Sequence, residues 1–313
     1  MYTLGIDTSN YTTSVALYNS ADNSVIQKKR LLPVKAGEIG IRQSDAVFHH
    51  TAALYQLLEE LLEGFDGKIE AIGCSDRPRE IEGSYMPCFT VGFGTAKSIA
   101  AVNSLPLYCF SHQQGHIAAA AYSANAACLL KERFVAFHVS GGTTEAVTVT
   151  PNDEKIVTCD YLCGSLDLKA GQAIDRVGRM LGLSFPAGME LEKLAQQCTQ
   201  KVKTRPVIKE MDCCLSGLEN QCAKMMQKGE APSYIARFCL ESVGAAIIKM
   251  TEAINDSVGK LPLLYAGGVM SDKIIKDMIK SNFDCYFAKP EFSCDNAAGV
   301  AFLAAIKNGG TTL

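Results

Sequence analysis

Two histidines, His112 and His116, stand four residues apart in the segment Ser111-His112-Gln113-Gln114-Gly115-His116. On a helix this spacing places both imidazoles on one face, about one turn apart, where two ring nitrogens could share a metal ion. A third ligand would have to come from elsewhere in the chain, and we expect Asp295 to supply it. Two alternatives stay open: the histidines could be partly buried with hydrogen-bond partners, and Asp295 could be the N-cap of the last helix.

Small residues follow several predicted strands and could bind phosphate through backbone N–H groups. Ser140-Gly141-Gly142 follows the apolar run 134–139, and Gly267-Gly268 follows the run 263–266. The first segment alone is more typical of a plain tight turn. Its combination with the second glycine pair favours a nucleotide site.

Two carboxylates stand close to these turns in the predicted fold. Asp7 ends the first strand, and Asp175 lies on the helix after Gly171. Either could reach a magnesium-bound water or a ribose hydroxyl. A turn cap for Asp7 and a solvated helix face for Asp175 explain them equally well.

The elements that would position these residues occur in an order that is used twice. The run 2–7, a Ser/Thr-rich turn and the run 13–18 predict a β-hairpin. Residues 134–139, the turn at Ser140 and residues 145–149 repeat this pattern about 130 residues later, which is typical of a duplicated fold.

Between and after the hairpins, helical and strand patterns alternate. Helices are predicted at 44–65, 94–102, 112–130, 168–181, 191–198, 235–255, from about 272 and at 296–307, with strands at 71–74, 107–110 and 263–266. The chain has 313 residues, which suits two domains. We expect an N-terminal lobe at 1–133, completed by the C-terminal helix at 293–313, and a C-terminal lobe at 134–292.

The bulk composition excludes several classes of protein. The formal net charge is −3, so a nucleic acid would need a local basic patch. One candidate patch is formed by Lys201, Lys203, Arg205 and Lys209, although a solvated surface loop explains these residues as well.

The thirteen cysteines are scattered through apolar stretches and predict free thiols. The start of the chain has no leader pattern and no run of residues is long and apolar enough to span a membrane, so we expect a soluble, cytoplasmic protein.

Taken together, ordered motifs along nearly the whole chain resemble one known family. They are Leu4-Gly5-Ile6-Asp7-Thr8-Ser9, Val91–Ser98, the His112/His116 pair, Val139-Ser140-Gly141-Gly142-Thr143-Thr144, Ala170–Val177, Leu181–Gly188, Leu215–Leu218, Ala266–Val269 and Cys294–Ala298. The family is that of the tRNA threonylcarbamoyladenosine synthases, formerly called O-sialoglycoprotein endopeptidases, of which this chain looks like a divergent paralogue.

The resemblance implies an α/β fold of the actin, hexokinase and Hsp70 superfamily, with duplicated ribonuclease-H-like domains and a cleft between them. It also implies an acyltransferase that moves a threonylcarbamoyl group from its AMP anhydride to N6 of the adenosine beside the tRNA anticodon. Family members commonly work inside complexes, so partner subunits or a homodimer are expected.

The resemblance also implies site residues. One divalent metal ion, Fe2+ or Zn2+, would be bound by His112, His116 and Asp295. ATP, ADP or an acyl-adenylate would be bound by residues of the glycine turns and the neighbouring helices: His138, Val139, Ser140, Gly141, Gly142, Asp175, Gly188, Gly267, Gly268 and Asp272. We assign the catalytic role to Asp7, Ser9 and Thr12.

Some family features are absent from this chain. Asn10-Tyr11-Thr12-Thr13 replaces the usual Cys-Asp-Glu-Thr, and Thr143 replaces a histidine. Asp272 replaces an asparagine, and 76–83 replaces an Arg-Gly-Pro-Gly loop. Two other functions therefore stay open: a carbamoyl, acyl or phosphoryl transferase acting on a small molecule, and a non-catalytic partner subunit.

Overall fold

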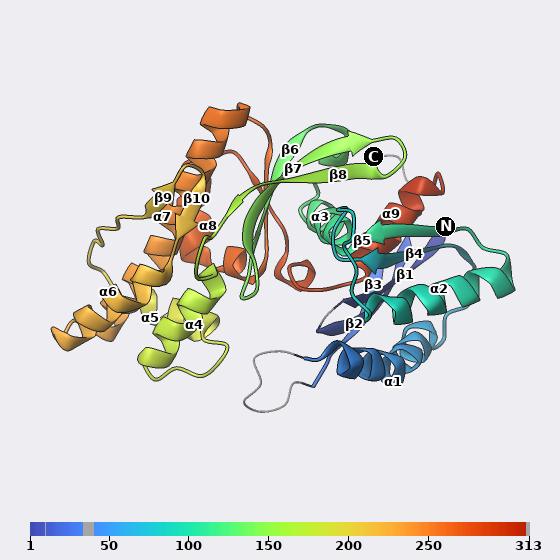
Figure 1. The fold of residues 1–313 in the computed structure, drawn as a ribbon, viewed down its shortest axis with the longest axis horizontal. Helices are drawn as coiled ribbons and strands as arrows, with labels where there is room; N and C mark the ends of the chain where they lie inside the picture. Colours follow the sequence, from blue (N-terminus) through green and yellow to red (C-terminus); the bar gives the residue numbers. More distant parts are fainter. Residues whose placement is uncertain (10, 34–40, 311–313) are drawn as a thin grey trace. The chain divides into compact units, whose positions relative to one another are not determined.

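The computed structural model describes residues 1–9, 11–33 and 41–310. Asn10, which belongs to one of the altered family motifs, lies outside these residues. The chain divides into two compact units. Unit 1 contains Met1–Glu132, Thr150–Cys159 and the described part of Glu291–Leu313, and unit 2 contains Arg133–Val149 and Asp160–Pro290. Each unit has its own five-stranded sheet and its own apolar core. Figure 1 shows the strands and helices of both units.

The sheet of unit 1 has the strand order β3-β2-β1-β4-β5. β1 (Tyr2–Ser9) and β2 (Thr12–Asn19) form the expected hairpin, which β3 (Ser24–Leu31) extends in the antiparallel sense. On the other side of β1, β4 (Ile69–Arg77) and β5 (Leu107–Ser111) run parallel to it. The carboxyl ends of β1, β4 and β5 therefore meet at one edge of the sheet.

Helices cover both faces of this sheet. Leu4 and Ile6 of β1 belong to an apolar cluster with side chains of α1 (Gln43–Leu62) and α2 (Phe89–Asn103). Gly5 lies between them and faces the opposite side, because successive residues of a strand point to alternate faces. That second face is covered by α9 (Ala298–Lys307), against which α3 (His112–Ser123) packs.

Close packing of α9 depends on glycines that leave no room for a side chain. A Cβ atom on Gly5 would lie 2.3 Å from the carbonyl oxygen of Ala297. A Cβ atom on Gly299 would lie 1.8 Å from the carbonyl oxygen of Gly115, in the first turn of α3. The backbones of α3 and α9 are therefore in direct contact.

Unit 2 repeats the strand arrangement of unit 1, which confirms the predicted duplication. Its strand order is β12-β11-β6-β7-β8. The strands are β6 (Phe134–Val139), β7 (Thr144–Asn152), β8 (Ile156–Gly164), β11 (Leu263–Ala266) and β12 (Tyr286–Phe287). The end of β7 and the start of β8 lie within Thr150–Cys159, which is counted with unit 1. β6 and β7 form the second hairpin, and β11 and β12 lie on the other side of β6 in parallel.

The helices of unit 2 surround a large apolar core. They are α4 (Ala170–Met180), α5 (Gly188–Ala195), α6 (Ser216–Gln227), α7 (Pro232–Val258) and α8 (Lys273–Lys280). A short hairpin of β9 (Val207–Lys209) and β10 (Asp212–Cys214) and the 3₁₀ helices η1 (Ala127–Lys131), η2 (Gly268–Ser271) and η3 (Pro290–Phe292) complete the chain. None of the helices within the described ranges is long and apolar enough to cross a membrane.

Two predicted helix boundaries are wrong for identifiable reasons. The helix at 112–130 ends at Ser123, because Asn125 adopts a left-handed conformation with φ of 54°. The last helix begins at Ala298 and not at residue 296, because the Asn296 side chain turns back to accept the N–H of Ala298 at 3.1 Å. All thirteen cysteines are free, as expected.

We predict that Gly299→Ala destabilises the protein by about 2 kcal/mol or more, because the added methyl group must push α9 away from α3. The measurement is the urea unfolding midpoint. Gly94→Ala is the matched control: a Cβ atom on Gly94 in α2 meets no atom within 4 Å. Because alanine favours the helix, this control should unfold at the same or a higher urea concentration. Equal midpoints for both variants would contradict the role of the α3–α9 contact.

Candidate metal and nucleotide sites

A capping box starts α3 and sets the direction of both histidines. Ser111 accepts the N–H of Gln114 with its hydroxyl at 3.2 Å, and the Gln114 side chain accepts the N–H of Ser111 at 2.7 Å. These bonds satisfy backbone groups that a helix start otherwise leaves unpaired. The helix therefore begins at His112, and His116 follows one turn later on the same face.

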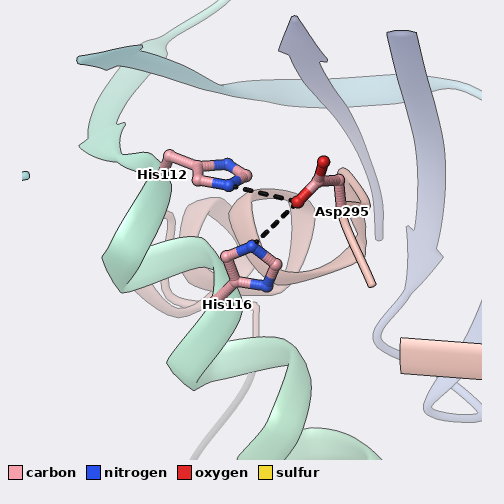
Figure 2. Close-up of side chains that lie close together, drawn as sticks. All are labelled: His112, His116 and Asp295. Carbon is pink, nitrogen blue, oxygen red and sulfur yellow. Dashed lines mark hydrogen bonds and ion pairs between the residues drawn. The ribbon is translucent and has the colours of Figure 1, made fainter. Parts of the chain in front are cut away.

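The two histidines converge on Asp295 (Figure 2). Nε2 of His116 lies 3.2 Å and Nε2 of His112 lies 3.4 Å from Oδ1 of Asp295. The imidazole centroids are 4.3 Å apart. Among the described residues this is the one group of three histidine, cysteine or acidic side chains with ligand atoms close enough to bind a metal ion together.

The separations of these atoms fit a transition-metal site. A metal held at about 2.1 Å by each ligand leaves neighbouring ligand atoms roughly 3.0–3.4 Å apart in tetrahedral or octahedral geometry. The two nitrogen–oxygen distances, 3.2 and 3.4 Å, fall in this range. Two imidazoles with one carboxylate are ligands that suit zinc and ferrous iron.

A buried carboxylate supports the first histidine from behind. Asp7, which is 1% exposed, lies 3.0 Å from Nδ1 of His112 through its Oδ1 and also accepts the hydroxyl proton of Ser75. Ser75 stands near the end of β4, beside β1 in the sheet. This chain of contacts fixes the ring so that Nε2, and not Nδ1, faces Asp295.

The charges of the cluster stabilise one another. Burial by itself would lower the pKa of His112, but the Asp7 and Asp295 carboxylates outweigh burial and raise that pKa to about 10. Burial would raise the pKa of Asp295, but hydrogen bonds to His112 and His116 hold it well below its ordinary value. A metal ion bound at Nε2 would displace the proton there and leave the Nδ1 proton donated to Asp7.

Asp295 does not cap the last helix, so that alternative for it is wrong. It precedes α9 by three residues, and its carboxylate is oriented by other groups. Thr12 donates its hydroxyl proton to Oδ2 of Asp295 at 3.2 Å, while Oδ1 faces the histidines. The contact with α3 through Gly299 brings this segment to the two rings.

The remaining residues expected to act in unit 1 occupy different surroundings. Asp7 has almost no exposed surface, and its carboxylate contacts His112 and Ser75. Its predicted role beside a magnesium-bound water or a ribose hydroxyl stays a prediction. Ser9 is 3% exposed, and its hydroxyl oxygen has no hydrogen-bond partner among the described residues. Ser9 and Thr12 are paired in the β1–β2 register, at the end of the hairpin.

In unit 2 the two glycine turns lie next to each other. β6 and β11 are neighbouring parallel strands with His138 opposite Ala266, so the turns that follow them meet at the same edge of the sheet. Gly267 adopts φ of 102°, and a Cβ atom there would lie 2.2 Å from the carbonyl oxygen of Val139. Only glycine allows this close approach.

Open space surrounds the tips of these turns. Cβ atoms placed on Gly141, Gly142 or Gly268 would meet no atom within 4 Å. The N-terminus of α4 lies against the first turn, where Gly171 donates its N–H to the Ser140 carbonyl oxygen at 3.1 Å. Backbone N–H groups and a helix N-terminus thus border a space that a phosphate group could occupy.

The other residues predicted to bind nucleotide are engaged in local contacts. Asp175 accepts the N–H of Ala187 at 2.9 Å and so holds the loop before Gly188, the first residue of α5. Asp272 is the N-cap of α8 and accepts the N–H of Ile275 at 3.0 Å; burial raises its pKa to about 6. A shallow cavity nearby contains none of the predicted residues; it is lined by Gln196, Arg237, Lys273, Ile274, Asp277, Met278 and Ser281.

The four cations of the basic segment all point to solvent. Lys201, Lys203 and Arg205 are exposed and alternate with half-buried residues, and Lys209 at the end of β9 is exposed as well. The intervening Val202 packs against the apolar core of unit 2. The segment therefore presents four positive charges to solvent.

Comparison with known sequences decides the family. A model of the family "TsaD: tRNA N6-adenosine threonylcarbamoyltransferase" matches residues 23–302. The chain belongs to this family. The tRNA N6-adenosine threonylcarbamoyltransferase of Thermus thermophilus is 29% identical over 97% of the chain and 92% of the relative. A protein of Thermoplasma acidophilum, named "Probable bifunctional tRNA threonylcarbamoyladenosine biosynthesis protein", is 26% identical over 96% of the chain and 55% of its own length.

Solved structures show the same fold. Component A of the (R)-2-hydroxyglutaryl-CoA dehydratase of Acidaminococcus fermentans has a TM-score of 0.57 at 15% identity and covers 99% of both chains. A ROK family glucokinase of Streptomyces griseus has a TM-score of 0.54 at 10% identity, covering 98% of this chain and 99% of the glucokinase. The predicted actin, hexokinase and Hsp70 fold is confirmed.

The threonylcarbamoyltransferase family fixes the class of enzyme. The chain is a transferase of the tRNA threonylcarbamoyladenosine synthase type, as its motifs predicted. The relatives favour neither of the other two functions, the small-molecule transferase and the non-catalytic subunit.

The threonylcarbamoyltransferase motifs did not reveal three residues that shape the site. Ser75 and Ser111 are ordinary serines near strand ends, and Gly299 is the second residue of the alanine-rich helix α9. A capping box can be recognised from Ser111 and Gln114. No pattern pointed to Ser75, because its contact with Asp7 joins residues 68 positions apart.

We predict that Ser75→Ala weakens divalent metal binding about tenfold, because the Asp7 carboxylate loses its donor and holds His112 less firmly. The measurement is calorimetric titration of the metal-free protein with Zn2+. Ser98→Ala is the control, since Ser98 lies on the exposed side of α2 and donates only to the Gly94 carbonyl oxygen. Unchanged zinc affinity in a folded Ser75→Ala variant would show that this support is unnecessary.

Proposed function

We propose that this chain transfers a threonylcarbamoyl group from its anhydride with AMP to N6 of the adenosine beside the tRNA anticodon. The observation that carries the proposal is the convergence of His112, His116 and Asp295 on one point, in a member of the threonylcarbamoyltransferase family. A protein that served only as a scaffold would have no use for three converging ligands.

The proposed metal site lies in unit 1. His112, His116 and Asp295 would bind Fe2+ or Zn2+. When bound, the ion would supply positive charge that orients the threonyl moiety and polarises a nearby oxygen. Asp7 positions one ligand ring, and Thr12 positions the Asp295 carboxylate.

In the first hairpin, we assign the hydroxyls of Ser9 and Thr12 to contacts with the reacting part of the substrate. Both lie at the end of the hairpin, and Thr12 directly contacts a proposed metal ligand. The family usually has a glutamate where this chain has Thr12. A hydroxyl cannot accept a proton as a carboxylate does, so these residues would orient the substrate by hydrogen bonding.

The proposed nucleotide site lies in unit 2, at the turns Ser140-Gly141-Gly142 and Gly267-Gly268. Their backbone N–H groups would bind the phosphate of the acyl-adenylate and stabilise the negative charge that develops on AMP as it leaves. Residues farther from the turns, Asp175, Gly188 and Asp272, would line the side toward the nucleoside.

A tRNA substrate requires a positively charged surface, because this chain has a net negative charge. We assign binding of the tRNA phosphates to the exposed basic segment formed by Lys201, Lys203, Arg205 and Lys209. Action on tRNA would place the protein in the cytoplasm. Partner subunits or a second copy of the chain would complete the complex, as the bifunctional Thermoplasma relative suggests by its name.

We predict that purified protein contains close to one divalent metal ion per chain and that His112→Ala abolishes this binding. Elemental analysis measures the metal. His49→Ala serves as the control, because His49 is a half-buried residue of α1 outside the group of three converging ligands and should not affect the metal content. Wild-type protein as free of metal as the His112→Ala variant would rule out the site.

In cells depleted of their own synthase, the wild-type chain with its partner proteins should restore threonylcarbamoyladenosine in tRNA, and His112→Ala should not. Mass spectrometry of tRNA nucleosides measures the modification. Failure of a well-folded wild-type chain would assign the metal site to a different transfer reaction.

We predict that Gly142→Ala weakens binding of an adenine nucleotide about tenfold, because the methyl group would occupy the space at the turn tip. The melting temperature should not change, since no protein atom lies within 4 Å of the added Cβ. Fluorescence titration with a labelled ADP measures the affinity, and Gly94→Ala should bind as wild type does. Equal affinities of both variants would remove Gly142 from the phosphate site.

A further inference from the structure

Two cysteines face each other across neighbouring strands, outside the proposed metal site. Cys74 of β4 and Cys109 of β5 are register partners in the parallel pair, and their Sγ atoms are 3.7 Å apart. Because register partners project from the same face of a sheet, the two thiols share one side of it. That is the side of α2, since Cys74 packs with Ala96 and Ala100 in the apolar cluster.

The two thiols differ in access to solvent. Cys74 is 0% exposed, whereas Cys109 is exposed on β5, the edge strand of the sheet. The Cys74 S–H lowers the pKa of Cys109, and Arg77 and Lys97 lower it further against the effects of burial and Asp76. The Cys109 thiolate can therefore react with a reagent that reaches it from solvent. The Cys74 thiol lies directly behind it and can react in a second step.

We propose that Cys74 and Cys109 are a reversible modification site that exchanges with a low-molecular-weight disulfide such as oxidised glutathione and closes to an intramolecular disulfide. None of the other described cysteine pairs combines one exposed thiol with a recorded Sγ–Sγ contact across paired strands.

The exchange proceeds in two balanced steps. The Cys109 thiolate attacks one sulfur of the small disulfide, which forms a mixed disulfide and releases one small thiolate. Cys74 then gives up its proton and attacks Sγ of Cys109, which forms the Cys74–Cys109 bond and releases the second small thiol. Two electrons pass from the protein thiols to the small disulfide, and the two thiol protons end on the released small thiols.

The strand geometry allows this bond. Neighbouring strands lie about 4.8 Å apart, within the range of about 4.4–6.8 Å that disulfides span between Cα atoms. The sulfurs must approach from 3.7 Å to a bond length of about 2.05 Å, which is a movement of roughly 1.7 Å. The edge strand β5 can accommodate part of this movement, because no further strand in the described part of the chain pairs with it.

Closure would act on the metal site, an effect that rests on the proposed function. Cys74 directly precedes Ser75, the donor to Asp7, and Cys109 lies two residues before Ser111, the cap of α3. The movement that brings the two sulfur atoms into bonding distance shifts the ends of both strands, and with them both groups that fix His112. We therefore expect the oxidised protein to bind a divalent metal about tenfold more weakly.

The test uses the full-length reduced protein, metal-free, incubated with oxidised glutathione and then alkylated. Intact mass should show a product that carries two alkyl groups fewer than the alkylated reduced protein, with no glutathione attached. Peptide mapping should link Cys74 to Cys109, and dithiothreitol should reverse the change.

Three variants separate this reaction from general thiol oxidation. Cys74→Ser should stop at the mixed disulfide of Cys109, because no second thiol completes the exchange. Cys109→Ser should form neither product at this place. Cys128→Ser, which removes another exposed cysteine, should still form the Cys74–Cys109 bond.

A wild-type protein that accumulates glutathione on Cys109 without closing, or that links a different pair, would overturn the proposal. None of these readouts requires metal or tRNA, so they stand apart from the transfer reaction. Zinc titration of the oxidised protein after removal of glutathione then tests the coupling. An affinity equal to that of the reduced protein would show that the disulfide does not influence the site.

Discussion

The contact between the backbones of α3 and α9 is the constraint on which the candidate metal site depends. Gly299 of α9 touches the carbonyl oxygen of Gly115, one residue before His116. Because no side chain separates the helices, the segment before α9 reaches the histidine face of α3. Asp295 then meets both Nε2 atoms within 3.4 Å. The ligands are few and polar, but apolar packing of small residues brings them together.

The repeated sheet explains why chemistry-bearing groups occur at strand ends in both units. In each sheet a hairpin is followed by two parallel strands, and the carboxyl ends of the central strands carry the functional residues. In unit 1, Asp7 and the capping box of α3 lie at that edge. In unit 2, two glycine turns with open space at their tips lie there. The same edge of the duplicated sheet thus carries the supports of the proposed cation site in unit 1 and the turns of the proposed anion site in unit 2.

Local sequence patterns predicted several features of this candidate site. The features that they did not predict depend on contacts between residues far apart in the sequence. The four-residue spacing of the histidines and the glycines after strands are local signals, and both are found in the structure. The loop position of Asp295 depends on the side chain of Asn296 and on packing at Gly299, which no short pattern reveals. The same holds for Ser75, which matters only because β4 lies beside β1. The end of α3 was missed because one left-handed asparagine outweighs an apolar run that continues beyond it.

The segment from Ser111 to His116 combines several tasks in six residues. It contains the cap, the capping partner, two proposed metal ligands and the glycine that allows α9 to approach. An α-helix turns by about 100° for each residue, so one inserted or deleted residue between the histidines would point one ring away from the other. Over evolution this segment should therefore keep its length in every relative that binds the metal. Length variation should instead accumulate in the loops on the far side of α3, where no ligand is displaced.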